Sequence, residues 1–462
     1  MNRVSTQDEL RLTPHPLQRA GAYAIAALAK AAHPEEVTGD QFDRVVERMI
    51  SDLIATSSIP KGNAGWYLMG ISYILWPNCA LHYKTKRTPE GLTAWRTMPP
   101  ADKWPGVPCS LCGRPACAWY GNVDIPLGAS IEHRNTTAPD HRGTPLCFPC
   151  VTSFHALPYV FTAGGGVLYG VHSWDEKFMG RVAHSAIAPN VRNMITRRDL
   201  KRDGGSFAVE FAALKALRWW DSRISAGVQA VQFSNSTRDM KFRIEAMEQP
   251  LAEWLRSTAS DTDRRTSFRY LAHTQATAKV PGLRMLAWRA FNRPEQIPSK
   301  ATGWLRDRIT DTGSIPAAVP HLAPLIRAYL TEVQHVLEKD VGHVTTVARR
   351  IADVVSTHDD KRLKKFVVAT RRPNDLKGWL RNEIADWAKK RPVDSTNDPF
   401  VTVPQWRVLF DSGNTSWSAR ELLFVAVFEE LCARGATVEA TDETTTDDDF
   451  TTLDTNDQEE NN

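Results

Sequence analysis

The chain has 462 residues, of which 42% are apolar and 24% are charged. This composition is typical of a folded protein with two or three domains. The sequence has no apolar run of the about 20 residues that span a bilayer and begins without the apolar stretch of a signal peptide, so we expect a cytoplasmic protein without a membrane partner.

The charges are distributed unevenly along the chain. The net charge is +4 at pH 7, but residues 439–462 contain ten Asp and Glu and no Lys or Arg, so residues 1–438 carry +14. A basic body favours a polyanion such as nucleic acid as the partner, although the same charge spread over a large surface could serve solubility alone. Residues 438–462 have too few apolar side chains to fold by themselves and are predicted to be a disordered acidic tail.

The first region, 1–104, is predicted to be helical. A first helix is expected from about Leu17 to Ala32. Thr38 and Gln41 have the spacing of a capping box, and the apolar residues after them recur at the three- and four-residue intervals of an amphipathic helix. Four prolines between residues 99 and 108 then predict a loop that leads to the next region.

Four of the seven cysteines form two Cys-x-x-Cys pairs in the middle of the chain. Two residues between thiolates allow one tight turn to direct both sulfur atoms at a single ion, and two such pairs complete the tetrahedral shell of zinc. An all-sulfur shell leaves no open position, so the sequence predicts a structural rather than a catalytic Zn²⁺. The predicted ligands are Cys109, Cys112, Cys147 and Cys150, with Cys117 as a weaker candidate.

The residues between the two pairs raise an alternative. Glu132 and His133 lie there, and HNH nucleases, which cut DNA with a second metal and a general-base histidine, also place a histidine between two Cys-x-x-Cys pairs. The residues after Cys150 lack the Asn or His and the Lys that usually follow in that motif. The main prediction is therefore a protein that is not an enzyme, and an HNH-like nuclease that uses His133 is the alternative.

The remainder of the middle region, 105–300, is predicted to contain strands. Residues 167–171 follow three glycines and form one expected strand. Residues 228–233 and 240–247 flank a turn-rich stretch and predict a β-hairpin.

Helical periodicity returns after about residue 315. Three apolar stripes, within 322–337, 344–355 and 376–387, are separated by short loops and predict an antiparallel helical bundle over 301–437. Ser418 and Glu421 have the spacing of another capping box, which would open the last helix. The predicted class is thus α+β: mostly helical, with a four-cysteine, zinc-stabilised α/β middle region and a C-terminal antiparallel helical bundle.

Two clusters of Lys and Arg could bind phosphate groups through their charge. Charge alone does not specify a base sequence, and the alternative for each cluster is a solvated helix face. The sequence contains neither a P-loop nor a Gly-x-Ser-x-Gly nucleophile elbow. The candidate nucleic-acid-binding residues are Arg192, Arg197, Arg198, Lys201, Arg202, Lys361, Arg362, Lys364, Lys365, Arg371 and Arg372.

A series of short motifs follows the order found in one known family. The most specific is Leu-Cys-Phe-Pro-Cys at 146–150, followed by Ala-Leu-Pro at 156–158, Gly-Gly-Val-Leu at 165–168 and His-Ser at 172–173. His-Pro-Leu at 15–17 and the stretch from 401 to 410 with Trp417 continue the pattern. From about residue 14 to 435 the chain resembles the CXXC-CXXC family of CRISPR-associated proteins, whose pattern lacks the acidic tail.

The resemblance implies a function in antiviral defence. Members of this family are the non-catalytic large subunit of type I-B-like Cascade complexes. Such a subunit recognises the protospacer-adjacent motif in target DNA, helps to open the duplex and recruits a separate helicase-nuclease. The implied partners are the guide-RNA ribonucleoprotein subunits, the double-stranded target DNA with its displaced strand, and the helicase-nuclease.

Overall fold

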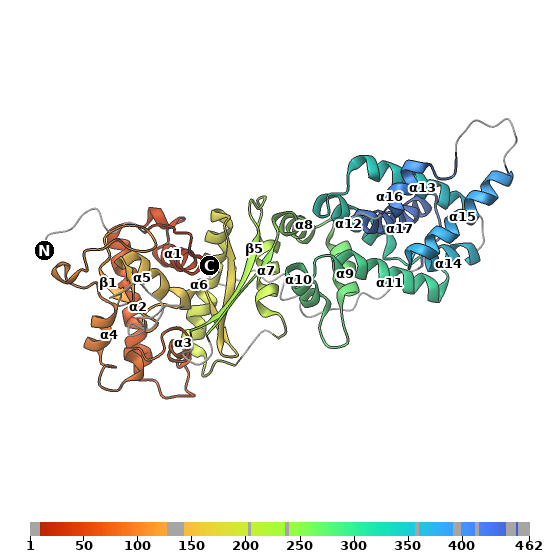
Figure 1. The fold of residues 1–462 in the computed structure, drawn as a ribbon. Coiled ribbons are helices and arrows are strands. Elements are labelled where there is room, and N and C mark those ends of the chain that lie inside the picture. Colours follow the sequence, from red (N-terminus) through yellow and green to blue (C-terminus); the bar gives the residue numbers. More distant parts are fainter. Residues whose placement is uncertain are drawn as a thin grey trace. The chain divides into compact units, whose positions relative to one another are not determined.

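The computed structural model describes residues 10–126, 143–201, 205–235, 240–355, 360–390, 399–411, 415–439 and 450. Throughout these ranges the chain is mostly helical with two small antiparallel sheets (Figure 1), which confirms the coarse α+β class predicted from the sequence. None of the helices in these ranges is both long and apolar enough to cross a membrane.

The described residues form two compact units. The N-terminal unit comprises residues 10–216 and 224–246, and the C-terminal unit comprises 217–223 and 247–439. The boundaries predicted after residues 104 and 300 do not coincide with this division. Residues on both sides of the first boundary belong to one hydrophobic core that extends from Leu10 to Phe233, and the second boundary falls inside helix α11 (Gln296–Thr312).

Helix α2 of the N-terminal unit begins as the local sequence predicts, and the helix expected from about Leu17 to Ala32 runs from Pro16 to Ala29. The Oγ1 atom of Thr38 accepts a hydrogen bond from the Gln41 N–H, and the Gln41 side chain accepts one from the Thr38 N–H, which confirms the capping box at the start of α2. Short 3₁₀ helices occur at Pro34–Glu36, Ala80–His82, Ala101–Lys103 and Leu157–Tyr159. The longer helices are α1 (Pro16–Ala29), α2 (Gly39–Ser57), α3 (Tyr67–Leu75), α4 (Pro89–Arg96), α5 (Phe148–His155), α6 (Glu176–Thr196) and α7 (Ala208–Arg218), of which the last two residues of α7 belong to the C-terminal unit.

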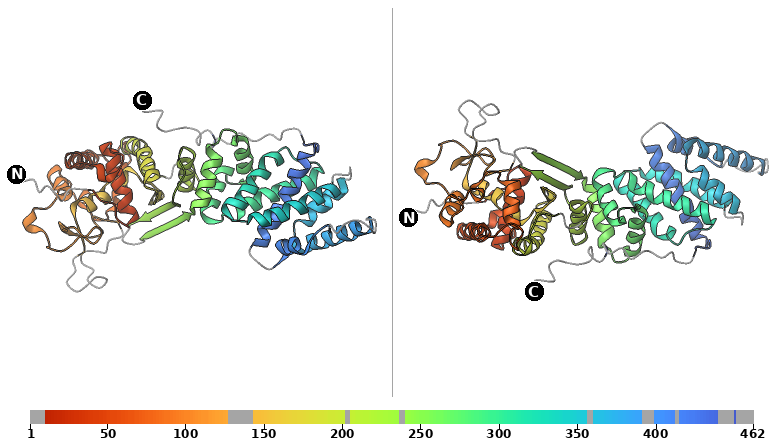
Figure 2. Two further views of the ribbon diagram at one scale, coloured as in Figure 1. Left: turned by 90° about the horizontal axis from the view of Figure 1, so that it is seen from above. Right: turned by 90° about the horizontal axis from the view of Figure 1, so that it is seen from below.

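Both sheets belong to this unit. Strands β1 (Ala118–Tyr120) and β2 (Thr144–Leu146) pair antiparallel beside the cysteines. The larger sheet has the order β3-β4-β5-β6, and Figure 2 shows β5 and β6 side by side, as the hairpin prediction requires. The strands of this sheet are β3 (Thr162–Gly164), β4 (Val167–Ser173), β5 (Val228–Ser234) and β6 (Lys241–Met247).

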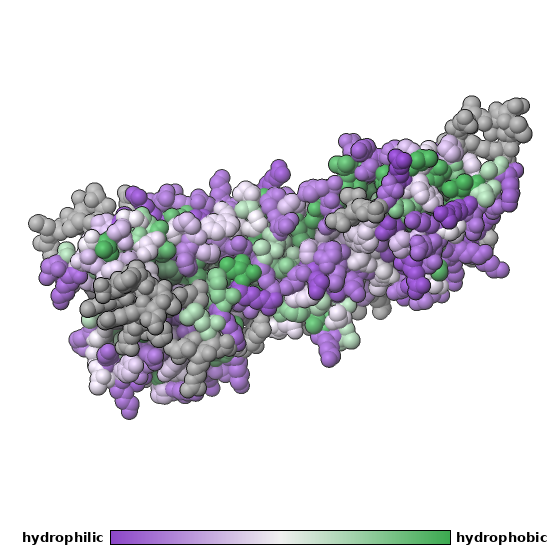
Figure 3. Space-filling view, in the orientation of Figure 1, coloured by the Kyte–Doolittle hydropathy of each residue, from purple (hydrophilic) through white to green (hydrophobic). Residues whose placement is uncertain are grey.

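The apolar faces of these elements are buried in the common core. On α2 the buried side chains include Phe42, Val45, Met49 and Leu53, which recur at the predicted helical spacing. Hydrophilic residues cover most of the face drawn in Figure 3, and hydrophobic residues form only local patches on it.

Helices α1 and α5 approach each other closely at Gly21. A Cβ atom at this position would lie 1.7 Å from the carbonyl oxygen of Ser153, so only glycine fits without movement of one backbone. We expect Gly21→Ala to destabilise the N-terminal unit by about 1–3 kcal/mol or more. Gly39→Ala is the matched control and should be nearly neutral, because nothing lies within 4 Å of the Cβ position there. Urea denaturation compares the two variants, and equal midpoints would contradict the close contact.

The C-terminal unit is built from helices that pack on one another, with α17 in contact with α11, α12, α13 and α16. The first predicted stripe falls on α12 and the following π-helical turn Tyr329–Val333 only as far as Val333; Val336 and Leu337 lie beyond the helix, and Leu337 is exposed. The second and third stripes fall on α13 and α15. The helices are α8 (Gln249–Ser260), α9 (Arg265–Gln275), α10 (Gly282–Asn292), α11, α12 (Val319–Ala328), α13 (Glu338–Val355), α14 (Asp360–Ala369), α15 (Pro373–Lys390), α16 (Val403–Phe410) and α17 (Thr415–Ala433).

The predicted capping box at the last helix is wrong. Helix α17 begins at Thr415, so Ser418 already lies inside the helix. Glu421 instead forms a buried ion pair with Arg306 of α11 at 2.9 Å. Ser418 and Glu421 have the spacing of a capping box, but the Glu421 carboxylate binds Arg306, a residue far away in the sequence.

The packed chain extends to the first residues of the predicted acidic tail. Val438 pairs with Ile315 in an isolated parallel bridge, and the Glu439 N–H donates to the Ile315 carbonyl oxygen at 2.9 Å. The hydroxyl of Ser314 also donates to the Glu439 carboxylate. Residues 440–449 and 451–462, for which disorder was predicted, lie outside the described residues.

Candidate metal centre

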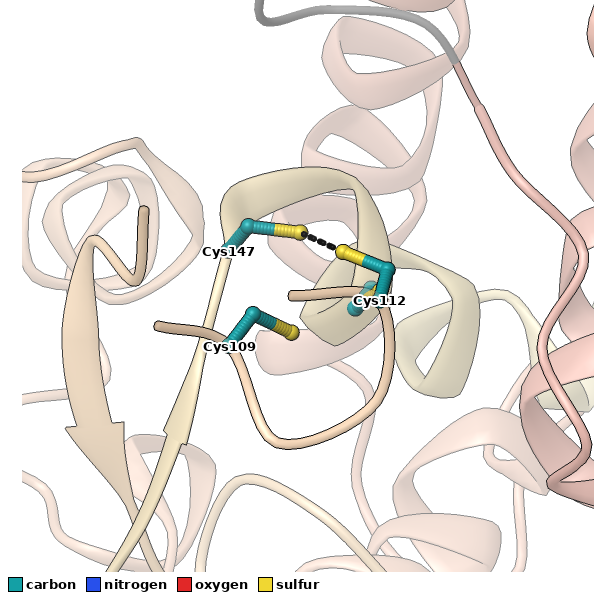
Figure 4. Close-up of side chains that lie close together, drawn as sticks. Cys109, Cys112 and Cys147 are labelled. Carbon is teal, nitrogen blue, oxygen red and sulfur yellow. Dashed lines mark hydrogen bonds between the residues drawn. The ribbon is translucent and has the colours of Figure 1, made fainter. Parts of the chain in front are cut away.

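Two separate elements of the N-terminal unit bring the paired cysteines together. Cys109 and Cys112 lie on a tight turn before β1, whereas Cys147 directly precedes α5 and Cys150 lies in the first turn of that helix. Figure 4 shows the sulfur atoms of Cys109, Cys112 and Cys147 directed toward one another from these two elements. The structure therefore assembles the predicted ligand set from segments far apart in the sequence.

Local hydrogen bonds hold the first pair in its turn. The Gly113 N–H donates to the Cys109 carbonyl oxygen at 2.9 Å, and the φ of +76° at Gly113 explains why glycine follows the pair. The Cys109 N–H donates to the Arg114 carbonyl oxygen at 2.6 Å. The Ser110 N–H donates to the Pro145 carbonyl oxygen at 2.9 Å, which fastens the turn to β2, the strand that leads directly to the second pair.

The four sulfur atoms have the separations of a common metal shell. All lie within 4.8 Å of one another, and those of Cys112 and Cys147 are 3.5 Å apart. A disulfide would require about 2.05 Å, whereas a tetrahedral ion bound at about 2.3 Å places its sulfur ligands about 3.8 Å apart. Cys109, Cys147 and Cys150 are buried and Cys112 is half-buried. These four cysteines could hold a metal ion.

The electrostatics of the cluster also favour a cation. Hydrogen bonds with Cys109 and Cys147 lower the pKa of Cys112, whereas hydrogen bonds with Cys109 and Cys112 raise the pKa of Cys150. The pKa of Cys109 is also lowered, to about 6, and that of Cys147 is raised, so the cluster without a metal favours the thiolate form of two cysteines and disfavours it in the other two. A divalent cation at the centre would lower the pKa of all four cysteines, because it stabilises the thiolate form of every ligand.

Arg114 is a residue of the site that the sequence analysis missed. Burial lowers the pKa of Arg114, but its hydrogen bond to Cys112 and the nearby cysteines outweigh burial and raise the pKa overall. Four thiolates around a divalent ion carry a net charge of about −2, so a guanidinium at the edge of the shell offsets part of it. The sequence indicated this residue only by its position, since an arginine directly follows Cys112 and Gly113.

Cys117, the weaker ligand candidate, lies outside the four-cysteine group. Its sulfur atom is 3.2 Å from the Tyr120 hydroxyl and 3.4 Å from the Leu146 carbonyl oxygen. Burial raises the pKa of Cys117, which keeps it a neutral thiol. Glu132 and His133, the residues of the nuclease alternative, lie outside the described residues.

The first basic cluster belongs to the N-terminal unit. Arg192 is exposed near the end of α6, and Arg198 and Lys201 are exposed on the segment that follows. The Arg197 guanidinium lies 4.8 Å from the centre of the Tyr67 ring, and its N–H donates to the Lys201 carbonyl oxygen. Arg202 lies outside the described residues.

The second basic cluster belongs to the C-terminal unit. Lys361, Arg362, Lys364 and Lys365 lie within α14 itself. Arg371 and Arg372 follow the helix. The Arg371 guanidinium forms an ion pair with Asp307 at 2.7 Å, which offsets part of the positive charge of the cluster.

Comparison of the chain with protein-family models, with curated proteins and with solved structures found no match in any of the three. The similarity to a CRISPR-associated family therefore rests on the sequence motifs, and the site rests on the geometry described above.

Proposed function

We propose that this chain is the non-catalytic large subunit of a guide-RNA-directed CRISPR interference complex, stabilised by a structural zinc ion. The observation that carries the proposal is the convergence of Cys109, Cys112, Cys147 and Cys150 within 4.8 Å of one another. The second of these pairs lies in the motif that carries the most specific family resemblance.

The donor set fits zinc in a structural role. Four thiolates complete a tetrahedral shell and leave no position for a substrate or a reactive water. The ion would link the turn at 109–112 to the N-terminus of α5, two elements otherwise joined through the small β1–β2 sheet. Zinc would thereby stabilise a loop-rich region and the helix that packs against α1.

The charge of the chain supports a nucleic-acid partner. Residues 1–438 carry +14, and exposed cations of the first basic cluster lie in the same unit as the cysteines. In the proposed complex this unit recognises the protospacer-adjacent motif in the target duplex and aids duplex opening. The C-terminal unit, which we propose to be a helical bundle, carries the second cluster toward the displaced strand, and the assembled subunit recruits the helicase-nuclease in the cytoplasm.

Co-expression with the neighbouring genes and a guide RNA, followed by affinity purification through this chain, tests the proposal. We expect a defined RNA, partner subunits and about one zinc ion per chain. Recovery of the chain alone, with zinc but without RNA, would contradict the Cascade function. Metal-dependent nicking of bare DNA that is lost in His133→Ala would instead identify an HNH-like nuclease.

A charge-removal variant tests the first basic cluster. We expect the triple change Arg192→Gln, Arg198→Gln and Lys201→Gln to weaken duplex binding and to reduce the slope of log affinity against log salt by about one for each phosphate that these side chains neutralise. The control is Lys389→Gln on α15, an exposed lysine whose partner is Asp386. Anisotropy titrations at several salt concentrations measure both quantities. An unchanged salt dependence in the triple variant would show that the cluster is a solvated surface.

A further inference from the structure

A row of aromatic side chains lies on the surface of the N-terminal unit at α3 and the segment after it. The Tyr73 ring lies flat against the His82 imidazole, with ring centres 4.0 Å apart and an interplanar angle of 6°. Trp66 stacks on Tyr73 at 6.5 Å. Tyr73 and the neighbouring Tyr83 are 52% and 46% exposed. We call Trp66, Tyr73, His82 and Tyr83 the aromatic platform.

Packing does not explain why Tyr73 points to solvent. Every other residue of α3 is buried, and Tyr73 is its one exposed position. The ring is nevertheless held in place, because the His82 imidazole beneath it forms a 2.9 Å hydrogen bond with the Ser72 hydroxyl. Burial, with a smaller contribution from Arg87, lowers the pKa of His82 to about 4, so the stacked ring is neutral at neutral pH. The Tyr73–His82 pair is thus an uncharged stacking surface that is held by its contacts.

Positive charges flank the platform, and its own segment of the chain carries no carboxylate. Between Asp52 and Glu90 the sequence contains no Asp or Glu. The ammonium of Lys61 lies 5.9 Å from the Trp66 ring, and that of Lys86 lies 5.5 Å from the Tyr83 ring.

These cations are available to a ligand. Lys61, Lys84 and Lys86 are exposed, and none of them forms an ion pair with another described residue. Lysines without an ion pair to a described residue therefore lie beside two of the platform rings, Trp66 and Tyr83.

The first basic cluster adjoins this surface. The Gly65 N–H, next to Trp66, donates to the Arg197 carbonyl oxygen at 3.1 Å. Leu200 and Trp66 meet at Gly70 of α3, where atoms of both side chains lie 2.8 Å from the position of a Cβ. Tertiary packing thus places the segment of Arg198 and Lys201 beside the platform, where Arg198 adds a positive charge and Lys201 pairs with Asp199 at 3.9 Å.

We propose that the aromatic platform binds single-stranded nucleic acid, with bases stacked on Tyr73 and Tyr83 and phosphates bound by Lys61, Lys84 and Lys86. Alternating aromatic rings and cations are the chemistry of single-strand binding, because every unpaired base offers a flat face and every nucleotide a phosphate. A duplex hides the base faces and would use the cations alone. The inference rests on the proposed function, because only a guide-RNA complex supplies such a strand here. The strand would be either DNA released by duplex opening or an unpaired part of the guide RNA.

Anisotropy titration of the purified full-length chain with fluorescent oligo(dT), oligo(rU) and a duplex of equal length tests the proposal. We expect Tyr73→Ala combined with Tyr83→Ala to weaken single-strand binding by about 10- to 100-fold, with little effect on the duplex. The control is Tyr73→Phe with Tyr83→Phe, which keeps both rings and should bind within about twofold of the parent chain. Preference for oligo(dT) or oligo(rU) distinguishes a DNA strand from a guide RNA.

A second measurement locates the contact directly. Ultraviolet crosslinking of bound oligo(dT), followed by peptide mass spectrometry, should identify peptides that contain Tyr73 or Tyr83. Both side chains are exposed, so the alanine variants should keep the melting temperature and the zinc content of the parent chain.

The outcomes separate this inference from the proposed function. If the alanine variants bind single strands with unchanged affinity, the proposal that the platform binds single-stranded nucleic acid is wrong, even if the chain still assembles with guide RNA. Tyrosine-dependent single-strand binding by a chain that recovers no guide RNA would keep the platform and reject the Cascade function. Binding of an acidic protein at these residues, with no nucleic-acid affinity, would also overturn the platform.

Discussion

Simultaneous replacement of Cys147 and Cys150 by alanine is expected to abolish metal binding and unfold the cysteine-centred part of the N-terminal unit. Structural zinc contributes about 10–16 kcal/mol of apparent binding energy in small zinc domains, which is comparable with the whole stability of a typical domain, about 5–15 kcal/mol. The two remaining thiols, Cys109 and Cys112, cannot complete the shell. Elemental analysis and thermal melting by circular dichroism measure the two effects.

Cys117→Ala provides the matched control for this experiment. Cys117 is a buried thiol of the same region that lies outside the four-cysteine group, so its removal should leave about one zinc per chain and lower stability only modestly. A strong chelator should destabilise the parent chain and the control but not the double variant, which has no metal to lose. A double variant with the zinc content and melting temperature of the parent would reject the ligand assignment.

Removal of the Glu421 carboxylate is expected to destabilise the C-terminal unit by about 3–5 kcal/mol, because it leaves the Arg306 charge buried without its anion. The two side chains are 10% and 8% exposed, and their atoms are 2.9 Å apart. The guanidinium also donates to Thr302 and Thr370 and lies 4.4 Å from the Phe424 ring, so it cannot move readily to solvent. Urea denaturation of Glu421→Ala measures the loss.

The control for this variant lies on the same helix. Glu430 of α17 pairs with Arg349, whose side chain is 63% exposed, and lies 3.8 Å from the guanidinium of Arg434, which is 34% exposed. Exposed pairs of this kind contribute about 0–1 kcal/mol, so Glu430→Ala should shift the denaturation midpoint only slightly. Similar losses in the two variants would show that the Arg306–Glu421 pair behaves as a surface ion pair rather than a buried one.

Local features of the structure could be predicted from the sequence because their causes are local. A Thr and a Gln three residues apart suffice to cap α2, and the apolar repeat after them suffices to specify its buried face. Two residues between cysteines set the spacing of each ligand pair within a single turn.

The same local signals failed where distant residues intervened. Ser418 and Glu421 have the spacing of a capping box, but Arg306 of α11 binds the carboxylate and the helix begins earlier. Arg114 was missed because its importance depends on the sulfur atoms around it. The predicted boundary after residue 104 does not separate the units, because the N-terminal helices share one core with the cysteine region.

The sequence by itself determined the identity of the candidate metal ligands, the capped start of α2 and the uneven distribution of charge, since each depends on residue types at short spacings. Only the tertiary structure decided that the two cysteine pairs meet and that Tyr73 stacks on His82 beside the segment of Arg197. Tyr73 lies in an apolar stretch whose pattern is that of a core helix. Its exposure depends on what the rest of the chain leaves uncovered, and that is a property of packing between segments far apart in the sequence.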